Sequence, residues 1–137
     1  MFVQFVKENL LLFAVAVTSG AMLIWPLLRR PGGGPAASTL QATQMINRQD
    51  AVVVDVREDA EYSKGHVMGA RHIPLSQLGA RAGELQKFKS RPLIAYCESG
   101  ARSGQAVSLL RKQGFEQVFN LTGGFAAWQQ AGLPVEK

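Results

Sequence analysis

Cysteine is nearly absent from this sequence. Its 137 residues include one cysteine, Cys97, and two histidines, His66 and His72. One cysteine cannot form an internal disulfide, which fits a reducing compartment and leaves a free thiol to be explained. Because a metal site needs several ligands and no second cysteine exists, we expect no metal site.

A concentration of charge of one sign is also missing. The formal net charge is +5, and the N-terminal group Lys7, Glu8, Arg29 and Arg30 contributes +2 of it. The other basic residues are scattered, without the stripe of Lys and Arg interleaved with aromatic residues that marks nucleic-acid-binding surfaces. We therefore expect no nucleic-acid partner.

Charge is absent altogether from residues 10–28, which read LLLFAVAVTSGAMLIWPLL. A helix of 19 residues rising about 1.5 Å per residue roughly matches the ~30 Å hydrocarbon core of a bilayer. Residues 2–6 can extend it. We predict that residues 1–30 form one transmembrane helix with its flanks and contact lipid through residues 10–28. A cleaved signal peptide and a buried core helix are the alternatives, but the run is long for a signal peptide and lacks a clear cleavage site.

Two arginines, Arg29 and Arg30, follow the apolar run directly. By the positive-inside rule they place the C-terminal side in the cytoplasm and the N-terminus outside. We thus expect a single-pass protein of a bacterial inner membrane. A protein of the same membrane is a possible partner.

The segment after the arginines, PGGGPAAS at 31–38, is rich in proline and glycine. We predict a flexible linker at 31–37 and one domain at 38–137. Ser38 with Gln41 three residues later forms a capping-box pattern, which predicts a helix that ends near Asn47.

Apolar runs and helical spacings alternate through this domain. AVVVDV at 51–56 and LIAYC at 93–97 are typical of buried parallel strands, with further strands expected at 117–121 and 70–73. Apolar residues at helical spacing predict helices at 75–88, 106–110 and 125–128. This alternation predicts an α/β fold with a central parallel sheet flanked by helices.

Cys97 falls at the carboxyl end of one predicted strand and is followed by ESGARS and a predicted helix. The backbone N–H groups of such a loop can curl around an anion at the helix N-terminus. Gly100 permits the unusual dihedrals of that curl, and Arg102 adds a positive charge. We therefore predict a lowered pKa and a nucleophilic thiolate at Cys97. A cysteine that packs as a small apolar residue, and a Cys–His pair with either histidine, remain alternatives.

Four ordered motifs carry a family resemblance: DVRE at 55–58, GHVMGARHIP at 65–74, CESGARS at 97–103 and GGFAAWQQAGLPV at 123–135. Over about residues 38–134 the chain resembles the single-domain rhodaneses, which are sulfurtransferases with the rhodanese-like fold. The loop is C-x4-R, whereas phosphatases on this fold carry the longer C-x5-R, so the spacing favours sulfur over phosphate.

The resemblance implies a two-step transfer through a Cys97 persulfide, without a cofactor. A small donor, thiosulfate or a persulfide, would supply the sulfur, and a thiol or cyanide would accept it. Asp55 and Arg57 are expected to support the loop through a charge network, and Arg102 to position an anionic donor. The resemblance assigns substrate binding to the loop: Glu98, Ser99, Gly100, Ala101, Arg102 and Ser103.

One loop residue departs from the family pattern. Thiosulfate-preferring members tend to carry a basic residue where this chain has Glu98, and a carboxylate there repels a dianion and opposes thiolate formation. The alternative function is a membrane-tethered binding module with little or no turnover. Other motif residues are expected to be structural: His66 bonded to nearby backbone, Trp128 in the core, and Gly123 and Gly124 at a close backbone approach.

Overall fold

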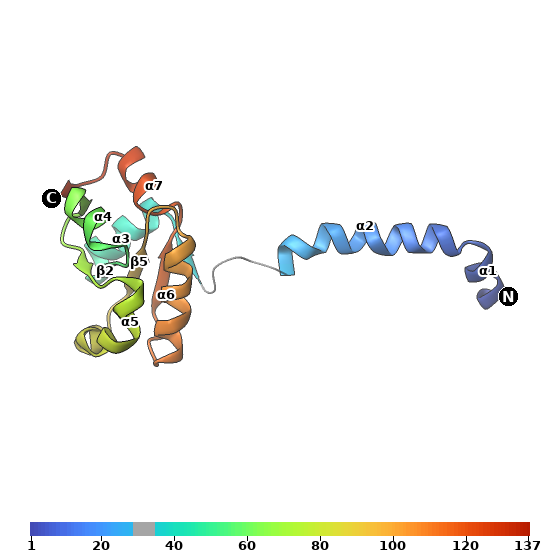
Figure 1. Cartoon of the computed structure of the whole chain (residues 1–137), viewed down its shortest axis with the longest axis horizontal. Helices are drawn as coiled ribbons and strands as arrows, with labels where there is room; N and C mark the ends of the chain where they lie inside the picture. Colours follow the sequence, from blue (N-terminus) through green and yellow to red (C-terminus); the bar gives the residue numbers. More distant parts are fainter. Residues whose placement is uncertain (29–34) are drawn as a thin grey trace. The chain divides into compact units, whose positions relative to one another are not determined.

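The computed structural model describes residues 1–28 and 35–137 (Figure 1). It divides into two compact units, Met1–Arg30 and Pro31–Lys137. Arg29 and Arg30, on which the topology argument depends, and residues 31–34 of the predicted linker lie outside the described residues.

The N-terminal unit contains two helices where one was predicted. Helix α1 (Phe2–Glu8) and helix α2 (Leu10–Leu28) are separated at Asn9, whose φ of −115° and ψ of 25° end α1. The Asn9 side chain donates to the Phe5 carbonyl at 2.9 Å, a local bond that competes with helix continuation. Residues 2–6 therefore do not extend the apolar helix.

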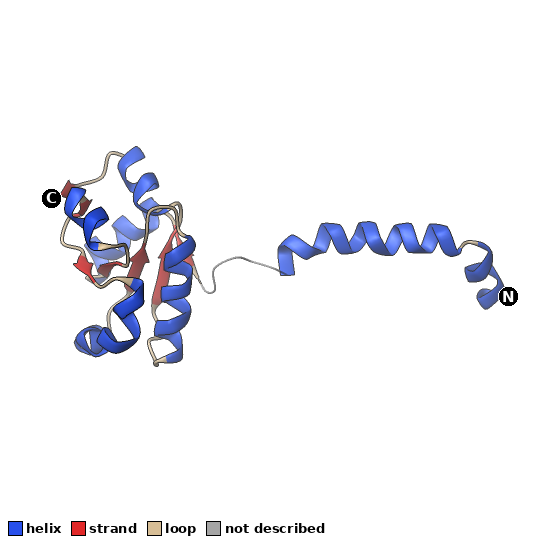
Figure 2. Ribbon diagram, in the orientation of Figure 1, coloured by secondary structure: helices blue, strands red, loops and turns tan. Residues whose placement is uncertain are grey.

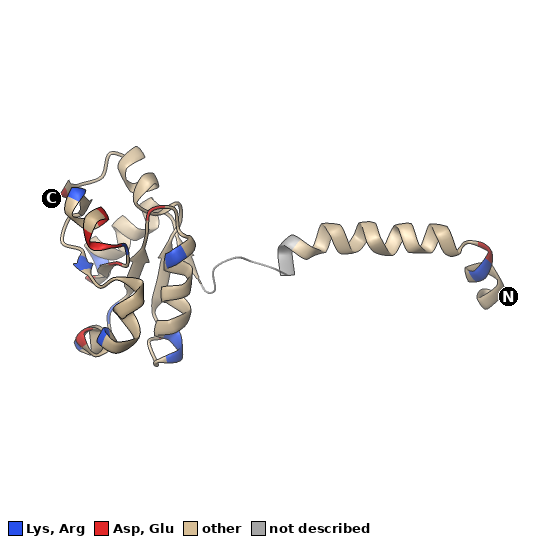
Figure 3. Ribbon diagram, viewed as in Figure 1, with Lys and Arg blue, Asp and Glu red and all other residues tan. Residues whose placement is uncertain are grey.

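Within the described part of the chain, no single helix meets the length and apolarity needed to cross a membrane. Helix α1 and residues 10–25 of α2 meet that requirement only as a pair, by length and composition, and they are bent by 81°. The prediction of one continuous transmembrane helix is therefore not supported. The described part of α2 carries no Lys, Arg, Asp or Glu (Figure 3).

The second unit is built on a five-stranded sheet of order β1-β6-β5-β2-β4, in which every pairing is parallel (Figure 2). The four predicted strands are confirmed as β2 (Val52–Asp55), β4 (Arg71–His72), β5 (Leu93–Tyr96) and β6 (Val118–Leu121). A second, antiparallel pair of β3 (His66–Val67) and β7 (Val135–Glu136) was not predicted.

Strand β1 (Ala36–Ala37) lies within the predicted linker. It pairs with β6 because the amides of Asn120 and Thr122 donate to the carbonyls of Pro35 and Ala37, at 2.9 and 2.8 Å. The linker is therefore shorter than predicted, since its last two residues belong to the sheet.

Six helices accompany the sheet: α3 (Thr39–Gln49), α4 (Asp59–Lys64), α5 (Leu75–Arg81), η1 (Ala82–Phe88, a 3-10 helix), α6 (Ala101–Lys112) and α7 (Gly124–Gln130). The Ser38 capping box is present, but α3 runs to Gln49, where Asp50 adopts a left-handed conformation. Helix α4 was not predicted, although Glu58 and Glu61 form a capping box at its start.

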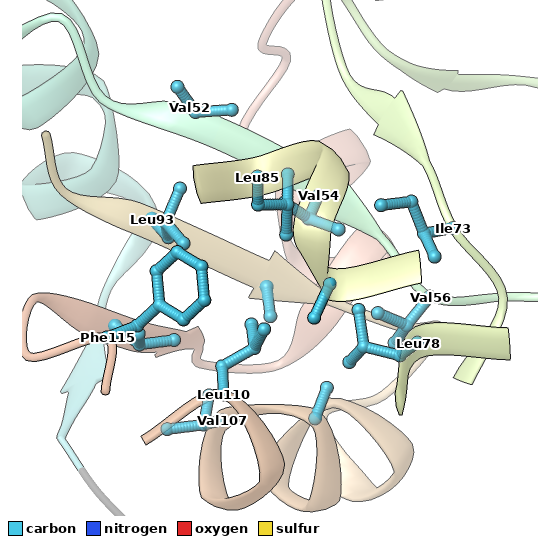
Figure 4. Close-up of a cluster of buried hydrophobic side chains, with 14 of the residues drawn as sticks. Val52, Val54, Val56, Ile73, Leu78, Leu85, Leu93, Val107, Leu110 and Phe115 are labelled. Atoms are coloured by element: carbon cyan, nitrogen blue, oxygen red, sulfur yellow. The ribbon is translucent and has the colours of Figure 1, made fainter. Parts of the chain in front are cut away.

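Alternating strand residues face two separate apolar clusters, as the two-residue period of a strand requires. Val52 and Val54 join the cluster covered by α5, η1 and α6, part of which Figure 4 shows. Val53 and Ile94 join the cluster covered by α3 and α7. Both faces of the central strands β2 and β5 are thus buried.

Candidate active site

Cys97 follows the last residue of β5 and precedes α6, at the carboxyl end of the parallel sheet. The residue is buried. Gly100 has a φ of +107°, a conformation that glycine adopts without steric cost, and its amide donates to the Cys97 sulfur at 3.0 Å. The Ser103 amide donates to the same sulfur at 3.4 Å. The loop thus curls around the sulfur as the sequence predicted.

The surroundings of Cys97 favour its thiolate. Burial raises the pKa of the thiol, but hydrogen bonds from the Ser103 hydroxyl and from the amides of Ser103, Gly100 and Ser99 outweigh it. The resulting pKa lies below the ordinary value. Donors around a buried sulfur favour its thiolate, which is the form in which a cysteine acts as a nucleophile.

Ser103 is held in place by Asn120 on β6. The Ser103 hydroxyl lies 2.5 Å from Asn120 Oδ1, 3.2 Å from the Gly100 carbonyl and 3.4 Å from the Cys97 sulfur. Asn120 Nδ2 also donates to the Gly100 carbonyl at 3.0 Å. Sequence reasoning missed Asn120, although a polar residue in the apolar run QVFNL was a signal for it.

The start of α7 supports the loop from a third segment. The Phe125 amide donates to the Cys97 carbonyl at 2.8 Å, and the Ala126 amide donates to the Glu98 carbonyl at 3.2 Å. Gly124 has a φ of +60°, and a Cβ there would overlap the Cys97 carbonyl oxygen. The close backbone approach predicted for Gly124 is confirmed.

Asp55 and Arg57 form a buried ion pair beside the loop. Arg57 Nη2 lies 2.8 Å from Asp55 Oδ2, and Arg57 Nη1 lies 3.2 Å from Glu98 Oε2. Burial alone would lower the pKa of Arg57. The hydrogen bond to Asp55 and its negative charge have the opposite and larger combined effect, so the pKa lies above its ordinary value. The guanidinium lies 4.3 Å from the centre of the Phe125 ring. The two residues expected to support the loop therefore reach it through Glu98.

Arg102 lies at the start of α6, and its guanidinium forms an ion pair with Glu61 that was not predicted. Its Nη1 and Nη2 contact the two carboxylate oxygens of Glu61 at 2.7 and 2.9 Å. The hydrogen bond to Arg102 lowers the pKa of Glu61 to about 2. Glu61 was missed together with α4, whose capping-box pattern was the available signal. The other loop residues predicted to bind substrate, Glu98, Ser99 and Ala101, are exposed.

The two histidines have partners other than the thiol. His66 Nδ1 lies 3.0 Å from the Tyr62 carbonyl and His72 Nε2 lies 2.7 Å from the Arg57 carbonyl. Their rings stack on Tyr62 at centroid distances of 3.8 and 4.3 Å. These contacts do not support a Cys–His pair. Among residues 1–28 and 35–137, no three His, Cys, Asp or Glu side chains are grouped so as to hold a metal ion.

The fold and the loop define the class of this protein: a parallel α/β domain with a cysteine in a curled loop between a strand end and a helix. Residues 38–131 match the model of the rhodanese-like domain. The chain belongs to this family.

Three similar proteins illustrate the match. The uncharacterized protein YqhL of Bacillus subtilis is 47% identical over 78 residues, which cover 57% of this chain and 60% of YqhL. A protein of Allochromatium vinosum named sulfurtransferase is 38% identical over 92 residues, which cover 67% of this chain and 84% of that protein. The solution structure of the rhodanese-like domain of the Anabaena protein Alr3790 has a TM-score of 0.68 and 35% identity, covering 76% of this chain and 80% of that one.

Proposed function

We propose that this protein is a sulfurtransferase that carries sulfane sulfur as a persulfide on Cys97. The observation that carries the proposal is the Cys97 sulfur itself, which lies at the carboxyl end of the sheet and accepts hydrogen bonds that lower its pKa. The relative in Allochromatium vinosum named sulfurtransferase supports it.

The transfer proceeds in two displacements. In the first, the Cys97 thiolate attacks the outer sulfur of the donor, whose S–S bond breaks and whose leaving group, sulfite or a thiolate, departs with the electron pair. In the second, a thiol or cyanide attacks the outer sulfur of the Cys97 persulfide and restores the thiolate. This is nucleophilic covalent catalysis, and it consumes no external oxidant or reductant.

The loop residues have distinct roles in this scheme. The amides of Gly100 and Ser103 and the Ser103 hydroxyl stabilise the thiolate, both as attacking group and as leaving group. Arg102 and Glu98 set the charge that a donor meets at the loop. Asp55 and Arg57 act as positioning residues because Arg57 holds Glu98.

We also propose that the N-terminal unit attaches the protein to a bilayer with the domain on the cytoplasmic side. The exposed apolar side chains of α2 support this, since Leu11, Leu12 and Val17 are each at least 67% exposed. Arg29 and Arg30 support the orientation.

Intact-mass measurement on the full chain in mild detergent tests the catalytic proposal. After incubation with thiosulfate or with an alkyl persulfide, the protein should gain one sulfur atom, which cyanide should remove as thiocyanate. Cys97→Ser should abolish the gain while the far-ultraviolet circular dichroism stays unchanged. A Cys97→Ser chain that still transfers sulfur would contradict the proposal. If neither donor transfers sulfur to Cys97 although its thiol still reacts with an alkylating agent, a membrane-tethered binding module is the better description.

A further inference from the structure

The cationic side chains around the Cys97 loop are paired with carboxylates. Arg57 contacts Asp55 and Glu98, and Arg102 contacts Glu61. Two guanidinium groups therefore meet three carboxylates, so this cluster carries net negative charge even though the whole chain is basic.

Glu61 is bonded to the two terminal guanidinium nitrogens with which Arg102 would bind an anionic donor. Both terminal nitrogens of Arg102 are used by the two oxygens of one carboxylate, the bidentate geometry in which guanidinium binds anionic oxygens most strongly. A donor with several anionic oxygens, such as thiosulfate, has to displace Glu61 before it can make the same contacts. A donor that needs no guanidinium contact can bind without breaking the Glu61–Arg102 pair.

Glu98 adds to this effect from the other side of the loop. Its carboxylate is half exposed and shares Arg57 with the buried Asp55. Asp55 takes the closer contact, at 2.8 Å against 3.2 Å, so Arg57 only partly offsets the charge of Glu98. A dianion that approaches the sulfur meets this carboxylate as well.

We infer that Glu61 is a specificity residue that occupies Arg102 and makes the loop selective for sulfur donors with at most one negative charge, such as alkyl persulfides. This inference rests on the proposed function and names its donor class. In the reaction, the Cys97 thiolate attacks the terminal sulfur of R–S–SH, the donor S–S bond breaks, and the departing RS⁻ takes the proton. The product is the Cys97 persulfide anion together with the thiol RSH.

The test measures second-order rate constants for sulfur loading of Cys97 in the full chain, with thiosulfate and with the persulfide of 2-mercaptoethanol. The wild-type chain should load faster with the persulfide. Glu61→Gln keeps the size of the side chain and removes its charge, so the ratio of the thiosulfate to the persulfide rate constant should rise roughly fivefold. The wild-type thiosulfate rate should also rise with sodium chloride, since salt screens repulsion, and Glu61→Gln should weaken that rise.

Glu84→Gln is the matched control. Glu84 pairs with Arg81 at 2.8 Å on the exposed surface of η1, so this change removes the same charge and also breaks an Arg–Glu pair. The donor ratio and its salt dependence should stay at their wild-type values in Glu84→Gln. If Glu61→Gln does not fold, Glu61→Ala carries the test, because it too removes the carboxylate that occupies Arg102 and should raise the ratio.

Each contrary result has a distinct meaning. A wild-type chain that loads faster with thiosulfate, or a ratio that Glu61→Gln leaves equal to that of Glu84→Gln, overturns the specificity inference and leaves the sulfurtransferase proposal standing. A wild-type chain that neither donor loads overturns the proposed function itself, and the inference with it.

Discussion

Ser103 contacts the Cys97 sulfur through two atoms, its amide nitrogen and its hydroxyl oxygen, each at 3.4 Å. The hydroxyl has one proton, so its donation to the thiolate competes with its donation to Asn120 Oδ1 and to the Gly100 carbonyl. Because burial alone raises the pKa of the thiol, the hydrogen bonds to the sulfur decide whether it is a thiolate. At the scale of single residues, the pKa of Cys97 therefore depends on a neighbouring side chain.

Replacing Ser103 by alanine should raise the pKa of Cys97. The hydroxyl stabilises the thiolate, so its loss should shift the pH profile of Cys97 alkylation by iodoacetamide to higher pH. The rate at pH 7 should then fall roughly two- to fivefold. In the wild-type chain the midpoint of the profile should lie below the ~8.5 of a free cysteine.

Ser108→Ala is the control for this profile. Ser108 lies on the same helix, but its hydroxyl donates to the Gly104 carbonyl rather than to the sulfur. Its profile should coincide with that of the wild-type chain. A Ser103→Ala profile that also coincides with it would show that the backbone amides alone set the pKa.

At the scale of elements, the loop is held between the starts of two helices. Helix α6 continues the loop directly, while α7 contributes the Phe125 and Ala126 amides that bind the Cys97 and Glu98 carbonyls. This contact needs glycine at 124, since a Cβ would overlap the Cys97 carbonyl oxygen and the left-handed backbone disfavours other residues.

Gly124→Ala should lower the free energy of unfolding by about 2–4 kcal/mol, because the strained backbone and the overlap have to be relieved by moving α7 away from the loop. Urea denaturation measures this change. Gly83→Ala is the control, since a Cβ at that position in η1 meets nothing within 4 Å. It should change the free energy of unfolding by less than about 1 kcal/mol. Equal stabilities for the two variants would contradict the close approach.

At the scale of the whole molecule, two units with different surfaces share one chain. The N-terminal unit exposes large apolar side chains, whereas the second unit buries most of its own in two clusters that cover both faces of the sheet. Large exposed apolar surfaces are typical of sites that contact lipid or another protein, and the proposed membrane attachment uses this one.

The full chain should therefore sediment with vesicles of phosphatidylethanolamine and phosphatidylglycerol, while a chain of residues 35–137 should stay in the supernatant. Leu12→Lys with Val17→Lys places two charges in the apolar stretch and should release much of the full chain, because each charge at the centre of a bilayer costs about 3 kcal/mol. Sedimentation of the double variant equal to that of the wild-type chain would argue against insertion of α2.

Most of the sheet was predictable from local sequence. Three of its five strands, β2, β5 and β6, lie in apolar runs, and buried parallel strands need such runs because both of their faces are covered. The curl at Cys97 was also predictable, since Gly100 and the following helix are adjacent to it in sequence. The bend at Asn9 was missed, although Lys7, Glu8 and Asn9 form a short polar stretch between two apolar segments.

The pattern of residues thus determined by itself that this protein has an α/β domain with a cysteine in a curled loop at a strand end. Its causes are local: the period of burial, the capping of helices and the freedom of glycine. Only the tertiary structure decided which charges surround the loop and which side chain holds Ser103. Glu61 meets Arg102 across 41 residues, and Asn120 meets Ser103 across 17, because the order of the strands brings those segments together. Side chains so distant in sequence leave no shared local pattern, so their contacts emerge only when the sheet forms.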